Sequence, residues 1–384
     1  MTTLYEVLKI ILAVLVIVLP LLLVGYLGMK FRKWRISKND AMPAEKNSHK
    51  KLWLIGLAAF ILLFAIIAIA NYLGNSQKTG EAGKPVIPKI DMHEHFRAGG
   101  DARYFLVAMA AAGIKKMVIV PTDWPPSNPK YKENLTAALE VKNKYPDKFI
   151  VFATAWNKDP DAAKIIEDAV KNGAGGMKFI DWLSSKKYPN EAGPVDSDNM
   201  YKVYEVAREY KVPVLMHIDF QKKPEWKAQF EKVAADFPDV TFILAHYCRA
   251  ASGKTPQLSL CAQTLDKFPN VYTDISMGGG LNRYRGYFDK SEASAKKFRD
   301  FIIKYQDRIL WGADIVLDGK IRDGVEKNPA WIFKRMATDF FILEHGKYLN
   351  LLHPEDKIIH RSLDLPDEVL QKIYWENPKK VLGI

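Results

Sequence analysis

Residues 86–96 read VIPKIDMHEHF, a short apolar run that ends in two histidines separated by one residue. The run predicts a β-strand, and side chains two residues apart on a strand point to the same face. His93 and His95 can therefore direct both imidazoles at one point, which is the arrangement that a metal site requires. A strand that simply ends in two polar residues fits the same letters, so the rest of the chain distinguishes the two interpretations.

Seven further apolar runs follow, and amphipathic segments separate them. The eight runs cover residues 86–93, 116–122, 149–156, 175–180, 212–218, 240–247, 270–276 and 308–314. Helical patterns cover segments such as 103–113, 133–145, 160–172, 200–211, 224–237 and 291–306. Strands that alternate with helices indicate a parallel sheet, and eight such units in about 230 residues predict an α/β fold of the (β/α)8 TIM-barrel type. A doubly wound open sheet is the alternative, but it favours a glycine-rich phosphate loop where the histidine pair stands.

The C-terminal tail predicts a helix that packs on the barrel. Pro366 stands at the expected start, and Val369, Leu370 and Ile373 follow at helical spacing. The dipeptide Asn377–Pro378 is expected to break this helix, and a short final turn would follow.

Reactive side chains recur at the ends of the predicted strands. They are Lys178 on strand four, His217 and His246 near the ends of strands five and six, and Asp314 at the end of strand eight. Barrel enzymes carry their chemistry at the carboxyl ends of the strands, so these side chains should converge with the first histidine pair. One such histidine alone would suggest a structural role. Several imidazoles with a carboxylate predict a divalent metal, Zn2+ first, and Mn2+ or Fe2+ fit the same donors.

Six short motifs resemble the amidohydrolase superfamily, in particular its amidohydrolase-related branch, also called amidohydrolase family two. The motifs are Asp91–His95, Gly175–Lys178, Pro213–His217, Leu244–His246, Trp311–Asp314 and Glu376–Leu382, and the resemblance extends over residues 86–384. It implies four metal ligands, namely His93, His95, His217 and Asp314. It also implies that His246 contacts the metal-bound water or the substrate.

Lys178 has two interpretations within this resemblance. In two-metal branches a strand-four lysine is carboxylated and bridges both ions, whereas a related one-metal branch lacks that bridge. We favour one metal, with Lys178 as a charge partner for the substrate or for Asp314, and a purely structural lysine is the remaining alternative. The sequence departs from the family after Asp314, where the long segment 320–352 replaces a short connection and leaves the substrate class open.

The donor set predicts hydrolysis through a metal-activated water. A divalent metal lowers the pKa of a bound water to about 7 and polarises a carbonyl group. Asp314 would orient that water and accept its proton, while His246 would stabilise the oxyanion or protonate the leaving group. The leading prediction is a metal-dependent hydrolase that cleaves a C–O or C–N bond in an ester, lactone or amide. A non-oxidative decarboxylase of an aromatic or unsaturated acid is the alternative in the same family, and a non-catalytic binding or sensory module is the alternative from another class.

Arginines near the predicted strand ends favour an anionic small-molecule substrate such as a carboxylate. Arg97 follows the first histidine pair, Arg249 follows strand six, and Arg283 and Arg285 follow strand seven. We expect Arg97, Arg283 and Arg285 to bind substrate, and solvated loop arginines are the equal alternative.

Two long apolar runs precede the catalytic segment, at residues 10–29 and 52–73. Each has about 20 residues without a charge, which is the length of a membrane-spanning helix. The connecting loop 30–51 has eight basic and two acidic residues, so the positive-inside rule places it in the cytoplasm and the catalytic domain outside, in the periplasm or on the outer face of the plasma membrane. Residues 74–85 are expected to be a linker. A cytoplasmic catalytic domain is the alternative, because lysines also follow the second span.

The composition excludes several classes. The formal net charge is +12, and half of it comes from loop 30–51, so the basic balance does not indicate nucleic-acid binding. Two cysteines, Cys248 and Cys261, exclude a disulfide-rich scaffold; they either form one bridge in an oxidising compartment or remain two free thiols. The sequence leaves the oligomeric state open, a homo-oligomer included.

Overall fold

The computed structural model describes residues 87–122, 128–180, 193–251, 255–277, 281–320, 327–352, 355 and 357–384, without the side chains of 281–283. Contacts between Cα atoms divide the chain into two units, Met1–Ala82 and Gly83–Ile384, and the described residues all belong to the second. The predicted spans 10–29 and 52–73 and the predicted loop and linker lie outside these residues. Within the described residues, no helix combines the length and the apolar character that crossing a membrane requires.

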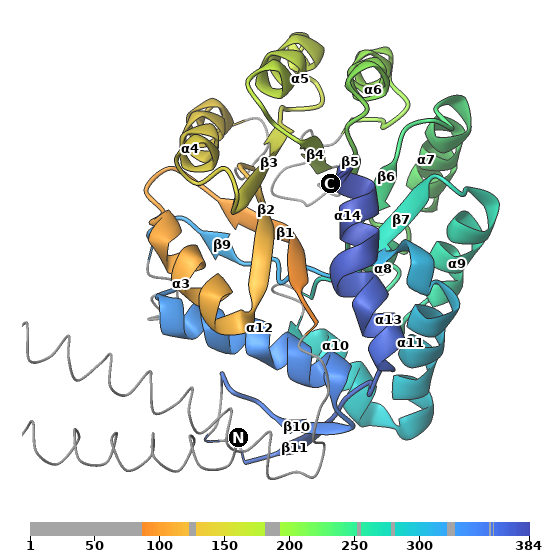
Figure 1. Cartoon of the computed structure of the whole chain (residues 1–384). Helices are drawn as coiled ribbons and strands as arrows, with labels where there is room; N and C mark the ends of the chain where they lie inside the picture. The colour runs from red at the N-terminus through yellow and green to blue at the C-terminus, as the bar shows by residue number, and fades with distance from the viewer. Residues whose placement is uncertain are drawn as a thin grey trace, which may run out of the picture. The chain divides into compact units, whose positions relative to one another are not determined.

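The described residues form one nine-stranded parallel sheet in the order β8-β7-β6-β5-β4-β3-β2-β1-β9, with helices on its outer side (Figure 1). The strands are β1 Lys89–Phe96, β2 Ile114–Val120, β3 Phe149–Thr154, β4 Gly176–Ile180, β5 Val214–His217, β6 Phe242–Leu244, β7 Val271–Asp274, β8 Ile309–Leu310 and β9 Val316–Leu317. The eight apolar runs of the sequence therefore correspond to β1 through β8.

Hydrogen bonds between β1 and the segment 311–317 join the two ends of this strand order. Met92 N donates to Trp311 O at 3.0 Å, and His95 N donates to Ile315 O at 2.9 Å. β8 and β9 are consecutive pieces of one stretch of chain, so the sheet closes on itself. The structure is thus an α/β fold of TIM-barrel type, and an open doubly wound sheet does not describe it.

Helices follow the strands along the chain, and most of them pack against the outside of the barrel. They are α3 Ala102–Ala112, α4 Lys130–Lys144, α5 Ala162–Lys171, α6 Asp198–Tyr210, α7 Pro224–Asp236, α8 Ala245–Cys248, α9 Leu258–Lys267, α10 Leu281–Lys290, α11 Glu292–Lys304, η2 Gln306–Arg308 and α12 Pro329–Glu344. The six predicted helical segments correspond to α3 to α7 and to α11. After Asp314 the chain forms β9, and the predicted long segment 320–352 then contains α12 and β10 (Lys347–Leu349). β11 (Ile359–Arg361) follows this segment and pairs with β10 in an antiparallel hairpin.

Two apolar clusters form the core. The larger lies between the strands and the helices, and the smaller fills the barrel interior. Fully burying one aliphatic or aromatic side chain contributes roughly 1.5–3 kcal/mol, so both clusters are strongly stabilising. The interior cluster consists of Ile90, Met92, Val118, Val120, Phe152, Leu215, Ile243, Ala245, Tyr272, Leu310 and Val381.

The predicted helix break at Asn377–Pro378 is wrong. α13 (Asp367–Gln371), the π-helical turn η4 (Lys372–Glu376) and α14 (Asn377–Leu382) follow one another directly, and Asn377 keeps helical φ and ψ of −64° and −46°. A proline ring normally clashes with the carbonyl four residues earlier. Here a π turn precedes the proline, Asn377 N–H bonds to Lys372 O five residues earlier, and the helix continues through Pro378.

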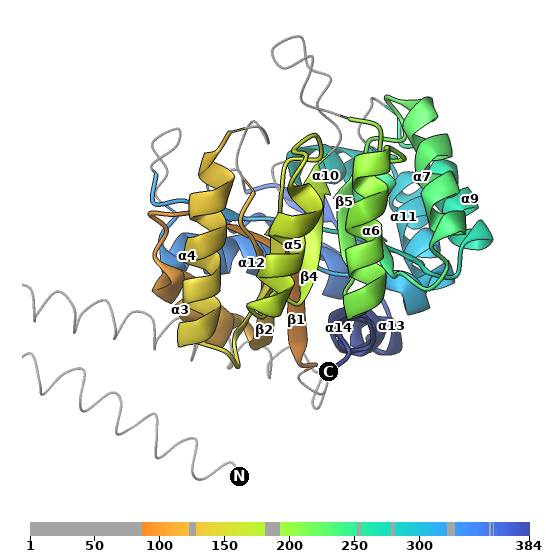
Figure 2. The ribbon, with the colours of Figure 1, turned by 90° about the horizontal axis from the view of Figure 1, so that it is seen from above.

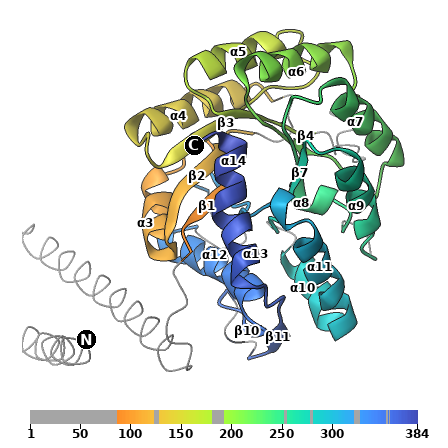
Figure 3. The ribbon, with the colours of Figure 1, turned by 45° about the vertical axis from the view of Figure 1, so that its right-hand side comes forward.

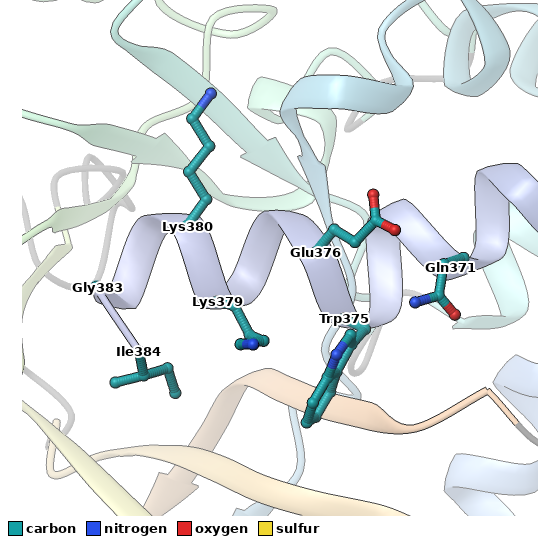
Figure 4. A pocket seen from close by; sticks show the side chains of 7 residues that line it. All are labelled: Gln371, Trp375, Glu376, Lys379, Lys380, Gly383 and Ile384. Carbon is teal, nitrogen blue, oxygen red and sulfur yellow. The ribbon is translucent and has the colours of Figure 1, made fainter.

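These last helices cover the end of the barrel where the strands begin (Figure 2). Asn377 Nδ2 donates to Ile309 O at 2.8 Å at the start of β8, and Val381 enters the interior cluster. A pocket of about 570 Å³ lies on this face (Figure 4), and none of the predicted site residues lines it. The pocket is formed by Gln371, Trp375, Glu376, Lys379, Lys380, Gly383 and Ile384. The predicted closing helix is therefore present, at the end away from the strand-end histidines.

Candidate metal centre

The histidine pair of β1 depends on an irregularity in the strand. The register with β2 shifts between Asp91 and Glu94, where β1 has one residue more than its partner. Met92 belongs to the barrel interior, so strict alternation would place His93 and His95 on the outer face. The extra residue reverses the alternation, and the two imidazole rings lie together with centroids 5.3 Å apart.

Two buried carboxyl groups hold this irregular stretch. Asp91 Oδ1 accepts a hydrogen bond from His93 N at 3.0 Å, and Glu94 Oε2 accepts one from Ile315 N at 2.6 Å. The two side chains are fully buried and interact with each other, and burial raises the pKa of both. A protonated carboxyl group can donate to an ionised one, so the pair supports the strand without two adjacent buried charges.

Asp314 enters the site from the stretch between β8 and β9 rather than from the end of a regular strand. Its φ is 55°, and its N–H donates to His93 O at 2.7 Å. Gly312 permits this approach, because a Cβ there would lie 2.7 Å from both Cβ and N of His93. The Oδ1 atom of Asp314 lies 3.1 Å from His95 Nε2 and 3.8 Å from His93 Nε2, and Oδ2 lies 3.7 Å from His246 Nε2.

His93, His95 and Asp314 form a group that can hold a metal ion, because one ligand atom from each lies within 4.8 Å of the others. Burial lowers the pKa of both imidazoles, which are therefore neutral at pH 7. Burial alone would raise the pKa of Asp314, but the neighbouring histidines outweigh it and lower that pKa, so the carboxylate is ionised. Metal ligation requires these protonation states. The donors fit a divalent ion such as Zn2+, Mn2+ or Fe2+.

Asp274, at the end of β7, forms hydrogen bonds with β1 and with α8, the two elements that carry His93 and His246. Its Oδ2 accepts from His93 Nδ1 at 2.9 Å, and its Oδ1 accepts from His246 N at 2.9 Å. Burial opposes ionisation of this carboxyl group, but its interactions with His93 and His246, including the hydrogen bond from His93 Nδ1, together with the charge of Lys178, outweigh burial and lower its pKa. The bond to His93 Nδ1 places the proton there and leaves the Nε2 lone pair for a metal.

His246 reaches the same space from a turn of left-handed backbone. Residues 246–249, in α8 and directly after it, all have φ between 54° and 58°. This backbone costs roughly 1–2 kcal/mol per non-glycine residue, so four in succession need compensating contacts. The imidazole donates from Nδ1 to Ser276 O at 2.9 Å, which leaves Nε2 facing Asp314. Burial lowers the pKa of His246 to about 4, so the ring is neutral at pH 7.

A disulfide bond between Cys248 and Cys261 joins this turn to α9, with Cα atoms 5.4 Å apart. Both cysteines are fully buried. α8 lies beside α9 and β7 (Figure 3). Of the two alternatives that the sequence leaves open for the cysteines, the structure therefore has the single bridge.

Lys178 and His217 lie close to the same histidines. Lys178 on β4 is fully buried, and its Nζ lies 3.1 Å from His93 Nε2. Burial lowers the pKa of Lys178 to about 8. The ring centroid of His217, at the end of β5, lies 4.6 Å from that of His246. The described residues form two close groups of three possible ligands, His93 with His95 and Asp314, and His93 with His246 and Asp274. Neither group includes His217, so its metal ligation stays a prediction.

Two arginines act electrostatically on the histidines. Burial is the main cause of the lowered pKa of His95, and Arg97 adds to it; Arg97 Nε donates to the carbonyl of Thr122 at 2.8 Å. Burial is the largest cause of the lowered pKa of His217, His246 is the second, and the charge of Arg249 lowers it further. Each arginine is also paired with a buried carboxylate, Arg97 with Asp318 at 3.7 Å and Arg249 with Asp219 at 3.6 Å.

Of the other two arginines singled out by the sequence, the structure describes the side chain of Arg285 alone. Burial raises the pKa of Tyr348 on β10, and the charge of Arg285 opposes that shift, so Arg285 acts near the hairpin. The side chain of Arg283 lies outside the described part of the chain. Substrate binding by Arg97, Arg283 and Arg285 stays a prediction.

Sequence reasoning missed three residues that orient the site. Asp274 and Ser276 hold His93 and His246, and Thr122 Oγ1 lies 2.6 Å from His95 Nδ1. Asp274 ends β7 and Thr122 follows β2. The strand-end rule that singled out the histidines could have found both, because it applies to hydrogen-bonding side chains as well as to metal ligands.

The barrel and its strand-end cluster define an α/β-barrel protein with a candidate metal centre. A family model described as Amidohydrolase (Amidohydro_2) matches residues 90–384. The chain therefore belongs to this amidohydrolase family. No curated protein matches the chain by sequence.

Several solved structures are similar in fold. One is a probable 2-pyrone-4,6-dicarboxylic acid hydrolase from Acinetobacter baumannii with citric acid bound, at TM-score 0.51 and 12% identity, covering 77% of this chain and 99% of that chain. Another is an apo protein from Agrobacterium tumefaciens, at TM-score 0.51 and 14% identity, covering 79% and 99%. At these identities the likeness shows the fold alone.

Proposed function

We propose that the protein is a metal-dependent hydrolase that cleaves a C–O or C–N bond in an ester, lactone or amide. The observation that carries this proposal is the close group of His93, His95 and Asp314, in which Asp314 comes from the stretch between β8 and β9. These residues, with His217 as the fourth ligand, would hold one divalent ion, Zn2+ before Mn2+ or Fe2+. When bound, the metal supplies a water of lowered pKa and polarises the scissile carbonyl group.

Asp314 and His246 are placed to move protons. Asp314 is ionised and directs one oxygen at the β1 histidines and the other at His246 Nε2, 3.7 Å away. It can therefore accept the proton of the attacking water. His246 keeps its own proton on Nδ1 in the bond to Ser276 O, so Nε2 can receive the proton and pass it to the leaving group.

The charges around the centre favour a substrate that carries a carboxylate. Lys178 is buried beside His93, and Arg97 and Arg249 act on the neighbouring histidines. Cations in a site of low dielectric attract an anionic group strongly and orient it before reaction. Lys178 would attract the substrate or Asp314 through its positive charge. It would not be carboxylated and would not bridge two metal ions.

Metal analysis and a substrate panel test the proposal. Full-length protein in detergent should hold about one equivalent of metal per chain. It should hydrolyse at least one ester, lactone or amide bearing a carboxylate, and a chelator should abolish this turnover until metal is restored. Two equivalents of metal would contradict the single-ion site. A fully loaded protein with no turnover across the panel would contradict the hydrolase and favour a binding or sensory module.

A non-oxidative decarboxylase of an aromatic or unsaturated acid is the second candidate. The observation that favours it is Lys178, a buried cation 3.1 Å from His93 Nε2, which could hold a reacting carboxylate inside the site. The products separate the two activities. Release of carbon dioxide from an aromatic acid supports the decarboxylase, whereas a new acid with an alcohol or amine supports the hydrolase.

We also propose that the barrel lies outside the cytoplasm, tethered by the predicted spans 10–29 and 52–73. The Cys248–Cys261 bond supports this, because disulfides persist in oxidising compartments and are rare in the cytosol. Alkaline phosphatase fused after Ile384 in a bacterial host should then be active. An inactive fusion would contradict the assignment.

A further inference from the structure

We propose that the Cys248–Cys261 disulfide positions His246 for the reaction by holding the left-handed turn that directs its imidazole at Asp314. The two cysteines would then be positioning residues that act through His246. The inference rests on the proposed function, because it gives His246 a part in turnover. It predicts that a chain without the bond keeps its barrel and loses much of its activity.

The residue types within the turn do not favour its left-handed backbone. None of residues 246–249 is glycine, although left-handed backbone favours glycine strongly. Its internal bonds run from Arg249 N to His246 O at 2.9 Å and from Ala250 N to Tyr247 O at 2.9 Å. These bonds join near neighbours, so they do not fix the turn against the barrel.

Contacts with three other elements fix it there. His246 N donates to Asp274 on β7 at 2.9 Å, and Tyr284 Oη on α10 donates to His246 O at 3.3 Å. The ring of Tyr247 packs edge-on against Phe298, with centroids 5.5 Å apart. The disulfide is the covalent contact, and it acts at Cys248, inside the left-handed run.

The other end of the disulfide is a firm attachment point. Cys261 is fully buried in α9. One helical turn further, Thr264 Oγ1 donates to Glu231 Oε1 of α7 at 2.8 Å. At the end of α9, Arg308 Nη1 donates to Phe268 O at 3.0 Å. The bond therefore ties Cys248 to a helix that is itself attached to two neighbouring segments.

The imidazole has little tolerance for movement. Its Nδ1 bond to Ser276 O is 2.9 Å long, and its Nε2 lies 3.7 Å from Asp314 Oδ2. Relaxation of Cys248 to right-handed backbone would reverse the turn that follows His246 and strain both contacts. A displacement of about 1 Å at a catalytic group can lower turnover about 100-fold.

A matched pair of double variants tests the inference in the full-length protein. Cys248→Ala with Cys261→Ala and Cys248→Gly with Cys261→Ala both lack the disulfide and the buried sulfur atoms. They differ only in the Cβ at position 248, and glycine adopts left-handed backbone without a steric penalty. We expect kcat to fall about 10- to 100-fold in the alanine pair, with KM nearly unchanged, and most of the loss to be recovered in the glycine pair.

Hydrogen–deuterium exchange of peptides covering 245–250 gives a readout that does not need activity. The alanine pair should lose protection there, and the glycine pair should retain it. If the wild type turns over no substrate, the proposed function fails, and exchange still decides this inference. Wild-type turnover and protection in the alanine pair would overturn it, because the packing of Tyr247 would then suffice. Equal losses in both pairs, or failure of both to fold, would also overturn it, because the bond would then stabilise the fold generally.

Discussion

β1 and α8 present histidines to one site by opposite means. β1 is a strand buried along its whole length, and a single extra residue directs His93 and His95 inward. α8 is a left-handed turn that its neighbours hold in place. The backbone of β1 itself thus fixes the positions of His93 and His95, whereas contacts with neighbouring elements fix the position of His246. Variants in β1 should therefore affect metal binding, and variants at α8 should affect turnover.

The largest effect is expected for His95→Ala. Loss of a ligand should lower metal affinity by more than about 100-fold, since removing even a group that orients a ligand costs about 10–100-fold. Competition with a chromophoric chelator measures this. His345→Ala, at an exposed histidine after α12, is the control and should bind metal normally. Full metal content in His95→Ala would remove β1 from the ligand set.

His246→Gln tests the other region. We expect metal affinity to stay within about threefold of wild type and kcat to fall about 100- to 10,000-fold, because a proton-transfer group is lost. Metal content and steady-state kinetics are measured on the same preparation. If metal and turnover disappear together, His246 is a ligand and the contrast between β1 and α8 is wrong.

Asp274→Asn should affect both regions, because Asp274 accepts from the His93 ring and from His246 N. The amide keeps the size of the carboxylate but has only one acceptor oxygen, whereas the two oxygens of Asp274 accept from His93, His246 and Ser276. We expect metal affinity to fall about 10–100-fold and kcat to be reduced even at saturating metal. A change in only one of these quantities would show that Asp274 serves one region alone.

The smallest effect is expected for Gly312→Ala, which tests how tightly β1 packs against the segment that carries Asp314. The new Cβ would lie 2.7 Å from His93 Cβ, so the free energy of unfolding should fall by about 1–3 kcal/mol. Gly286→Ala in α10 is the control, because no atom lies within 4 Å of its added Cβ. It should be neutral or stabilising by up to about 1 kcal/mol in denaturant unfolding. Equal stability of the two variants would mean that the segment can move away from β1.

The strand ends were the predictable part of the site. Hydrophobic runs mark the strands of a parallel barrel, because buried strands need apolar side chains on both faces. The polar residue that follows each run must then lie near the barrel mouth. This reasoning brought His93, His95, His246 and Asp314 into one cluster, as their distances show.

Other features of the structure have no recognisable pattern in the amino-acid sequence. The extra residue in β1 is invisible because Asp91 through His95 are all buried, so no alternation of exposed and buried positions marks the shift. The left-handed turn at 246–249 contains no glycine, and contacts distant in sequence create it. The continuous helix through Pro378 depends on a π turn, which local propensity does not predict.

The start of β1 has a practical consequence. The strand enters the barrel at the end covered by α13 and α14, and His93 lies four residues after Lys89, about 13 Å away at about 3.3 Å per strand residue. Ile87, where the described part of the chain begins, thus lies at the end of the barrel away from the strand-end histidines. An immobilisation tag joined directly to Ile87 would therefore leave the barrel from the end covered by α13 and α14.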